Sequence, residues 1–133
     1  MIGQKEADVE HAVKSYRDLI AWQRARELVK EVYLLTATFP VGERFGLVSQ
    51  MDRTAVSIPS NIAEGYGRAT TQDYLHFLRI AHGSAYELET QLVLAEDLGL
   101  CGRQASSKVV ATLQEAIRLL QGLIAALERR AGK

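Results

Sequence analysis

The chain has 133 residues, of which 47% are hydrophobic, so it is long enough for one domain with a single core and too short for two. Lys plus Arg and Asp plus Glu both number 16, and this zero formal charge argues against a whole-molecule attraction to nucleic acid or to an acidic membrane. The single cysteine, Cys101, excludes an internal disulfide and fits a reducing compartment.

The N-terminal residues give no sign of export. Residues 1–17 lack the apolar core of a signal peptide, and we expect them to be an extension ahead of a folded domain over residues 18–131. No apolar run approaches the roughly 18 residues that span a bilayer. We therefore expect a cytoplasmic protein with no membrane partner.

The first amphipathic segment predicts a helix over about residues 19–38. Its apolar residues recur at three- and four-residue steps, which is the spacing of one helix face. They are Trp22, Ala25, Leu28, Val29, Val32 and Tyr33. The pair Phe39-Pro40 ends the run, because proline cannot continue a helix without losing a backbone hydrogen bond.

The second segment predicts a helix over about residues 44–65 that contains a proline and ends at glycine. Pro59 has no backbone N–H and crowds the preceding turn, so we expect a kink there. A polar stripe follows one side of this helix at three- and four-residue steps. Its members are Gln50, Arg53, Ser57, Asn61, Glu64 and Arg68.

The last two segments predict helices over about residues 71–98 and 104–130. Thr70 or Thr71 begins the third helix, and Gly99 followed by Leu100 is typical of a helix end. The fourth helix spaces its leucines and isoleucines as a heptad does. Four helices joined by short turns predict an all-α fold, an antiparallel up-down-up-down four-helix bundle.

If the second helix lies antiparallel to the third, each residue of its polar stripe comes close to a residue of the third helix. The expected pairs are Arg53 with Glu87, Ser57 with Gly83, Asn61 with Arg79, and Glu64 with His76. Three interpretations stay open: a solvated face with weak ion pairs, a partly buried polar ladder that fixes the helix register, or a ligand or nucleic-acid site. In the ladder, Gly83 would let the two backbones approach closely.

The third helix also has more apolar faces than a single protomer needs. Beside its core seam, a second stripe is formed by Leu75, His82, Tyr86 and Val93. An exposed apolar patch of this kind usually marks an interaction surface. We expect these four residues to lie in an oligomer interface, unless neighbouring helices cover them.

The sequence offers little for catalysis. His11, His76 and His82 have no partner spaced for zinc, and there is no glycine-rich phosphate loop. Cys101 lies in a turn with no evident base or cation nearby. We therefore expect no enzyme, no metal and no cofactor.

An ordered series of residues resembles a known family. It runs as Trp22-Gln23-Arg24-Ala25, Phe39-Pro40, Gly46-Leu47, Ser57-Ile58-Pro59-Ser60-Asn61-Ile62-Ala63-Glu64-Gly65, Phe77-Leu78 and Gly83-Ser84. The series resembles the bacterial four-helix-bundle family first noticed as reading frames inside intervening sequences of 23S ribosomal RNA. The resemblance implies a small antiparallel bundle that assembles into a ring-shaped homopentamer, with no established enzymatic activity.

A related protein, the accessory protein of diversity-generating retroelements, binds nucleic acid and a reverse transcriptase. Those accessory proteins are strongly basic, whereas this chain is neutral, and nucleic-acid affinity rests largely on cations. The candidate contacts to RNA or DNA are the local cations Arg24, Arg26, Lys30, Arg44 and Arg68.

Three functional hypotheses follow. The first is a non-catalytic, self-assembling helical-bundle scaffold. The second is a nucleic-acid-binding accessory module that uses arginines repeated around an assembled ring. The third, a metal-dependent or hydrolytic enzyme, has the least support from the residues.

Overall fold

The structure is a computed structural model that describes residues 13–132. The elements are the short 3-10 helix η1 (Tyr16–Asp18), α2 (Ile20–Thr36), the 3-10 helix η2 (Val41–Glu43), α3 (Leu47–Tyr66), α4 (Thr71–Asp97) and α5 (Arg103–Ala131). Within the described residues there is no strand. Of the expected N-terminal extension, only residues 13–17 lie in this range.

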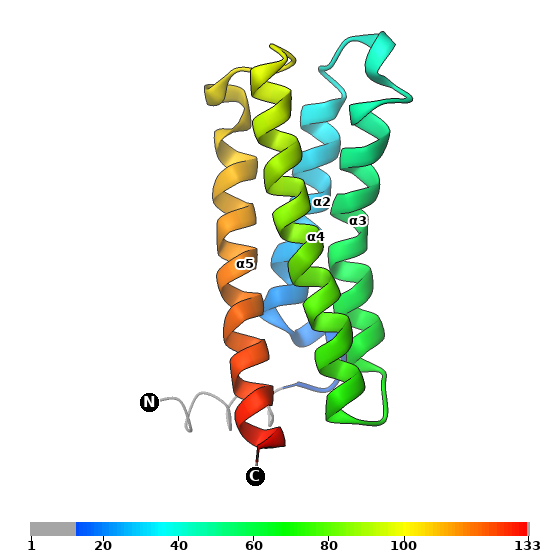
Figure 1. Cartoon of the computed structure of the whole chain (residues 1–133), viewed down its shortest axis with the longest axis vertical. Helices are drawn as coiled ribbons and strands as arrows, with labels where there is room; N and C mark the ends of the chain where they lie inside the picture. The colour runs from blue at the N-terminus through cyan, green and yellow to red at the C-terminus, as the bar shows by residue number, and fades with distance from the viewer. Residues whose placement is uncertain (1–12, 133) are drawn as a thin grey trace.

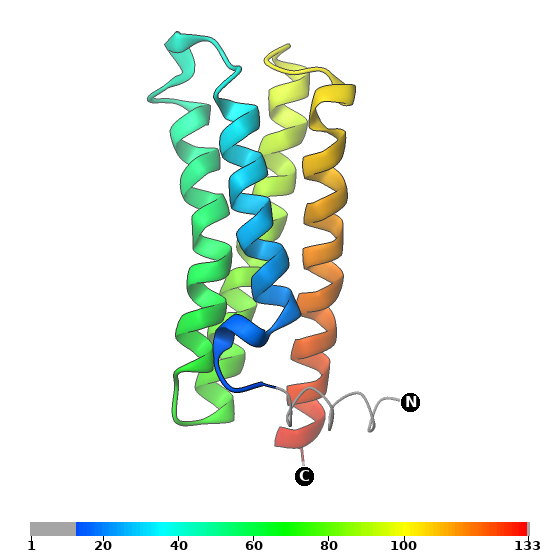
Figure 2. The ribbon, with the colours of Figure 1, turned by 180° about the vertical axis from the view of Figure 1, so that it is seen from behind.

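The four long helices form one bundle, in which each helix runs opposite to the one before it (Figure 1). Each helix packs on the next in sequence, and α5 packs back on α2, so that the four close around a common core. The reverse view shows α2 and α5 side by side (Figure 2). The predicted all-α fold class is confirmed.

One hydrophobic core runs along the bundle axis, and each helix supplies residues to it at three- and four-residue steps. The fully buried large side chains are Leu28 and Val32 from α2, Met51, Ile58 and Ile62 from α3, Leu78, Leu88 and Leu92 from α4, and Leu113 and Leu120 from α5. These residues belong to the apolar stripes that the sequence predicted. The spacing of apolar residues along each helix therefore sets which side of the helix faces the core.

The ends of α4 have the predicted signals. Thr70 caps the start, and its side chain accepts a hydrogen bond from the backbone N–H of Asp73 at 3.1 Å. At the other end Gly99 has φ +73°, a left-handed conformation that favours glycine. The N–H of Leu100 then bonds to the Ala95 carbonyl at 2.9 Å, as in a Schellman ending.

The start of α3 differs from the prediction. The helix expected from about residue 44 begins at Leu47. Gly46 has φ −104° and ψ −116°, which lies outside the helical region, so residues 44–46 form a turn instead. Pro59 lies inside α3 without ending it. The kink expected at Pro59 stays a prediction.

By length and composition alone, α5 is apolar enough to cross a membrane, although the sequence analysis expected no such segment. The reason is that closely spaced Leu, Ile, Val and Ala residues raise the mean hydropathy of α5, although polar residues such as Gln114 and Gln121 keep the apolar run from being continuous. In the bundle α5 packs on α2 and α4 and buries Leu113, Leu120 and Leu127.

Candidate functional site

The polar side chains of α3 bond mainly to the backbone of their own helix. The hydroxyl of Thr54 donates to the Gln50 carbonyl at 2.8 Å, and that of Ser57 donates to the Thr54 carbonyl at 2.6 Å. The Asn61 amide donates to the Ser57 carbonyl at 2.7 Å. The Ser57 and Asn61 bonds flank Pro59, but the carbonyl that Pro59 leaves without its helical N–H is that of Ala55, which none of these three bonds reaches.

The expected pairs between α3 and α4 are replaced by other partners. Arg53 is exposed and donates to the Ser49 hydroxyl at 3.0 Å within α3, instead of reaching Glu87. Glu64 forms an ion pair with Arg68 at 2.7 Å, also outside the core. Arg79 pairs with Glu128 on α5 at 2.6 Å, so it points away from Asn61.

Gly83 does not face α3 either. It is exposed, and a Cβ added to it would meet nothing within 4 Å. The glycine that permits close approach of α3 and α4 is Gly65, where an added Cβ would lie 2.9 Å from the Cβ of Phe77 and 3.1 Å from the Tyr74 carbonyl. The two helices therefore approach each other closely at Gly65, which ends the Ser57–Gly65 run of α3, near the α3–α4 turn.

Tyr74 and Tyr66 pack edge to face beside Gly65, with ring centroids 6.1 Å apart. Burial raises the pKa of Tyr74 to about 12, and Tyr66 adds to the shift. This phenol therefore stays protonated at neutral pH and acts as a packing residue.

Buried or partly buried polar contacts do cross between helices, among them the 3.1 Å bond from the Ser106 hydroxyl on α5 to Glu96 on α4, and none of them was predicted from the sequence. The Gln91 amide on α4 donates to the Thr54 hydroxyl on α3 at 3.1 Å, and the Thr36 hydroxyl on α2 donates to Asp52 on α3 at 2.8 Å. Gln91 and Thr36 each interrupt a row of apolar residues that faces the core. A polar residue in such a row is the feature of the sequence that could have indicated a buried polar contact. Thr54 and Asp52 are thus the residues through which α3 is hydrogen-bonded to its neighbours. They lie on a different side of α3 from the predicted polar ladder.

The four predicted interface residues of α4 fall into two groups. Leu75 is only 2% exposed and belongs to the core, so its assignment to an oligomer interface was wrong. It lies near the start of α4, where its side chain turns toward the bundle axis. Tyr86 and Val93 are exposed at 44% and 53%, and His82 is half-buried with its ring 4.9 Å from that of Tyr86.

Other large apolar side chains extend this exposed surface along α4. The exposed apolar residues of the helix and its C-terminal end are Ile80, Tyr86, Val93, Leu94 and Leu98. We call them, together with Gly83, Glu87 and Thr90 between them, the outer face of α4. Tyr86 accepts a weak hydrogen bond from Gln121 on α5 at 3.4 Å, so its ring lies along the surface rather than in the core.

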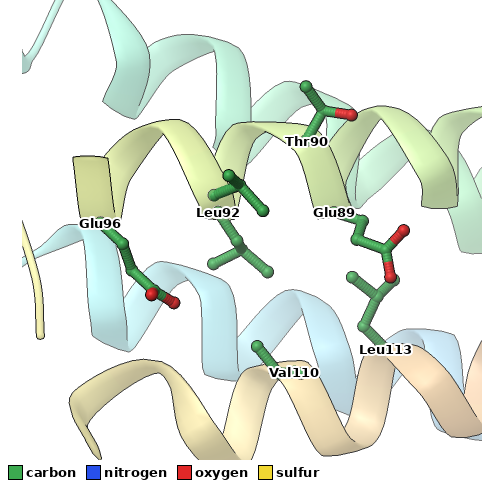
Figure 3. Close-up of a pocket in the computed structure, with 7 residues that line it drawn as sticks. Glu89, Thr90, Leu92, Glu96, Val110 and Leu113 are labelled. Atoms are coloured by element: carbon green, nitrogen blue, oxygen red, sulfur yellow. The ribbon is translucent and has the colours of Figure 1, made fainter. Parts of the chain in front are cut away.

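A shallow groove of about 310 Å³ lies between α4 and α5, beside this outer face. Figure 3 shows Leu92, Val110 and Leu113 in the groove, with Glu89 and Glu96 extending from α4 toward α5. No Lys or Arg is among the lining residues. The groove is therefore apolar with an acidic margin.

The candidate nucleic-acid contacts are dispersed over the protomer. Arg24 pairs with Glu27 and Glu115, and Arg68 pairs with Glu64 while lying over the ring of Phe77. These ion pairs neutralise both arginines.

The other three cations, Arg26, Lys30 and Arg44, are exposed, and no carboxylate in residues 13–132 forms an ion pair with them. Arg26 lies 5.6 Å from the centre of the Trp22 ring. Of the five candidate contacts, three are thus exposed cations without an ion pair to a described carboxylate.

In residues 13–132, no group of three His, Cys, Asp or Glu side chains is placed to hold a metal ion. Burial raises the pKa of the Cys101 thiol, and Glu96 raises it further, which disfavours the nucleophilic thiolate. A half-buried neutral thiol of this kind has a packing role.

The comparison with protein families gives one match, and the search of curated proteins gives none. The profile of the 23S rRNA-intervening sequence protein family matches residues 17–122, which include most of η1, all of α2, α3 and α4, and most of α5. Because the match covers well over half of the chain and the fold is helical, this protein belongs to the 23S rRNA-intervening sequence protein family.

Proposed function

We propose that the protein is a non-catalytic, self-assembling helical-bundle scaffold. The observation that carries this proposal is the outer face of α4, which exposes large apolar residues such as Tyr86, Val93 and Leu94 along the second half of a 27-residue helix. Contiguous apolar surface of this kind is unfavourable in water and is usually covered by a partner. A homo-oligomer covers it without any second protein.

The resemblance to the family further suggests a ring-shaped pentamer, and we adopt it as the working assembly. In this proposal the protein works in the cytoplasm, without a membrane partner, metal or cofactor. The raised pKa of Cys101 disfavours its thiolate, which supports a role without cysteine catalysis.

Light scattering of the purified chain over a range of concentrations tests the assembly. One chain has a mass of 14.7 kDa, so the proposal predicts a single species at a whole-number multiple of that mass, and five times for a pentamer. A species of one chain's mass at micromolar concentration would contradict the proposal.

A nucleic-acid-binding accessory role is the second candidate. It is favoured by one observation, that Arg26 and Lys30 lie exposed on the same side of α2 without an ion pair to any described carboxylate. Repeated around a ring, such pairs would form a basic surface that a single protomer lacks. Retention on single-stranded RNA and on duplex DNA, measured from low to physiological salt, tests it. No retention even at low salt would eliminate this role.

A further inference from the structure

Two helices of the protomer present outer faces of opposite charge. From residue 80 to residue 102 the sequence has four carboxylates and no Lys or Arg. These carboxylates are Glu87, Glu89, Glu96 and Asp97. Glu87 lies on the outer face of α4 and Asp97 is exposed beside its C-terminal end, whereas Glu89 and Glu96 line the groove toward α5, so the outer face carries acidic side chains and no Lys or Arg.

The opposite properties occur on α2. Its exposed side carries the cations Arg26 and Lys30, together with Tyr33 and Leu34, which are 48% and 65% exposed. We call these four residues the outer face of α2. The one carboxylate exposed nearby, Glu27, is paired with Arg24. The outer face of α2 is thus basic and apolar.

Charge decides which surface can cover the outer face of α4. Two copies of that face packed on each other would bring carboxylates such as Glu87 and Asp97 of both chains together, and like charges at an interface are costly. Glu96 and Asp97 also lie in the last turn of α4, where the helix dipole disfavours anions; Glu96 has Arg103 at 4.0 Å, whereas Asp97 forms no ion pair with a described cation. A partner surface that is cationic and apolar avoids the repulsion between like charges and also compensates the anions at the end of α4. The outer face of α2 in a second copy is such a surface.

Hydrogen bonds inside the bundle show which residues of α2 and α4 lie at the same height. Thr36 on α2 bonds to Asp52, and Thr54, two residues further along α3, bonds to Gln91 on α4. Because α3 and α4 are antiparallel, moving two residues back from Thr54 on α3 corresponds to moving two residues on from Gln91 on α4. Asp52 is therefore level with Val93. Thr36, which bonds to Asp52, is at the same height. Six residues back along both helices, which run in the same direction, Lys30 is level with Glu87 (Figure 1).

The same count places Arg26 level with Gly83 and Tyr33 level with Thr90. Gly83 lies in the interior of α4, where glycine costs about 1 kcal/mol relative to alanine, yet nothing in the protomer occupies the space of a Cβ. Within one chain the position is as open as Gly122 on α5, so no packing contact requires the glycine. It leaves room for a side chain as large as Arg26 from a neighbour.

We propose that the outer face of α2 in one copy packs on the outer face of α4 in the next, with Lys30 beside Glu87 and Arg26 over Gly83. This inference rests on the proposed self-assembly and specifies its contact. Each copy uses both faces once, so the contact is heterologous and repeats from copy to copy. In a ring whose axis is parallel to the bundle, residues at equal height meet, as the pairing requires.

Charge reversal tests the pairing. We expect Lys30→Glu and Glu87→Lys each to raise the protein concentration at which half of the assembly dissociates by at least about tenfold, because each brings like charges together. The double variant Lys30→Glu/Glu87→Lys should recover most of the assembly. Lys108→Glu, which reverses an exposed charge on α5, is the matched control and should leave the mass unchanged. Sedimentation velocity gives the masses, and circular dichroism checks the fold.

A steric variant tests the same contact without relying on charge. Gly83→Trp should fold as a bundle, because the site is open in the protomer, but should give single chains. A wild-type chain that is itself single would overturn the proposed function together with this inference. An assembled wild type, with Lys30→Glu, Glu87→Lys and Gly83→Trp all equally assembled, would overturn only the inference. Loss in both charge variants without recovery in the double variant would overturn the pairing of Lys30 with Glu87.

Discussion

The two sides of α4 differ in how completely the rest of the protomer packs against them. On the side that faces α3, Gly65 allows close helix contact, and Gln91 reaches the Thr54 hydroxyl. On the outer side, Tyr86 and Val93 are about half exposed. The same helix therefore has one face completed within the chain and another that is completed only by a partner, in our proposal a second copy.

This difference separates the residues that build the fold from those that we assign to assembly. The run Ser57-Ile58-Pro59-Ser60-Asn61-Ile62-Ala63-Glu64-Gly65 carries most of the family resemblance, and in the structure it serves the protomer. Ile58 and Ile62 are in the core, and Asn61 bonds to the backbone of its own helix. A family motif can thus describe how a bundle packs without describing what it binds.

The largest effect on the inner side is expected at Gly65. Gly65→Ala should lower the free energy of unfolding by about 1–3 kcal/mol, because the added methyl group would overlap Phe77 and the backbone of Tyr74. Gly122→Ala on α5 is the matched control, since nothing lies within 4 Å of its added Cβ and alanine favours the helix. Urea unfolding measures both. Equal stability of the two variants would show that Gly65 is not a close-packing site.

The buried pair of Thr54 and Gln91 should respond asymmetrically. Thr54→Val should cost about 1–3 kcal/mol, because it leaves the Gln91 amide buried without an acceptor, while its Oε1 already has no partner. Gln91→Leu should cost less, since the Thr54 hydroxyl still donates to the Gln50 carbonyl. Thermal unfolding of the two single variants and the double variant measures the difference. A larger loss for Gln91→Leu than for Thr54→Val would contradict this account.

The sequence predicted the repeating features of the fold and few of its single contacts. Helical spacing identified core residues such as Leu28 and Leu78, because their burial follows from periodicity. Helical spacing misplaced Leu75. The core seam of α4 and its second apolar stripe lie only about 100° apart around the helix, and residues of both can face the core of a bundle. Helical spacing also missed the bond from Gln91 to Thr54, since side-chain direction depends on the rotation of each helix about its own axis.

The pH dependence of stability should report on Asp52. Burial raises the pKa of this carboxyl above its ordinary value of 3.8, and the hydrogen bond from Thr36 opposes part of the shift. The folded state thus binds the proton more tightly, so the ionised carboxyl costs stability above the raised pKa, and this cost disappears as the pH falls below 3.8.

Asp52→Asn should therefore give a small gain in the free energy of unfolding at pH 7, because its Oδ1 can still accept from Thr36. The gain should vanish near pH 3. Urea unfolding at both values measures it, and the same gain at both would rule out a raised pKa as its cause.

The smallest effect is expected at Arg53. This residue is exposed and bonds to Ser49 on its own helix, so Arg53→Ala should change the free energy of unfolding by less than about 0.5 kcal/mol. A pairing with Glu87, as the ladder interpretation required, would instead give a loss of about 1–3 kcal/mol. A loss in that higher range would restore the ladder.

The most direct test of the central claim, that the outer face of α4 is covered by another copy, is the mass in solution of Tyr86→Glu/Val93→Glu. Both residues are exposed in the protomer, so the variant should keep the helical circular dichroism of the wild type. Light scattering should then give 14.7 kDa, the approximate mass of one chain, while the wild type gives a multiple of it. A variant that assembles to the wild-type mass would contradict the claim.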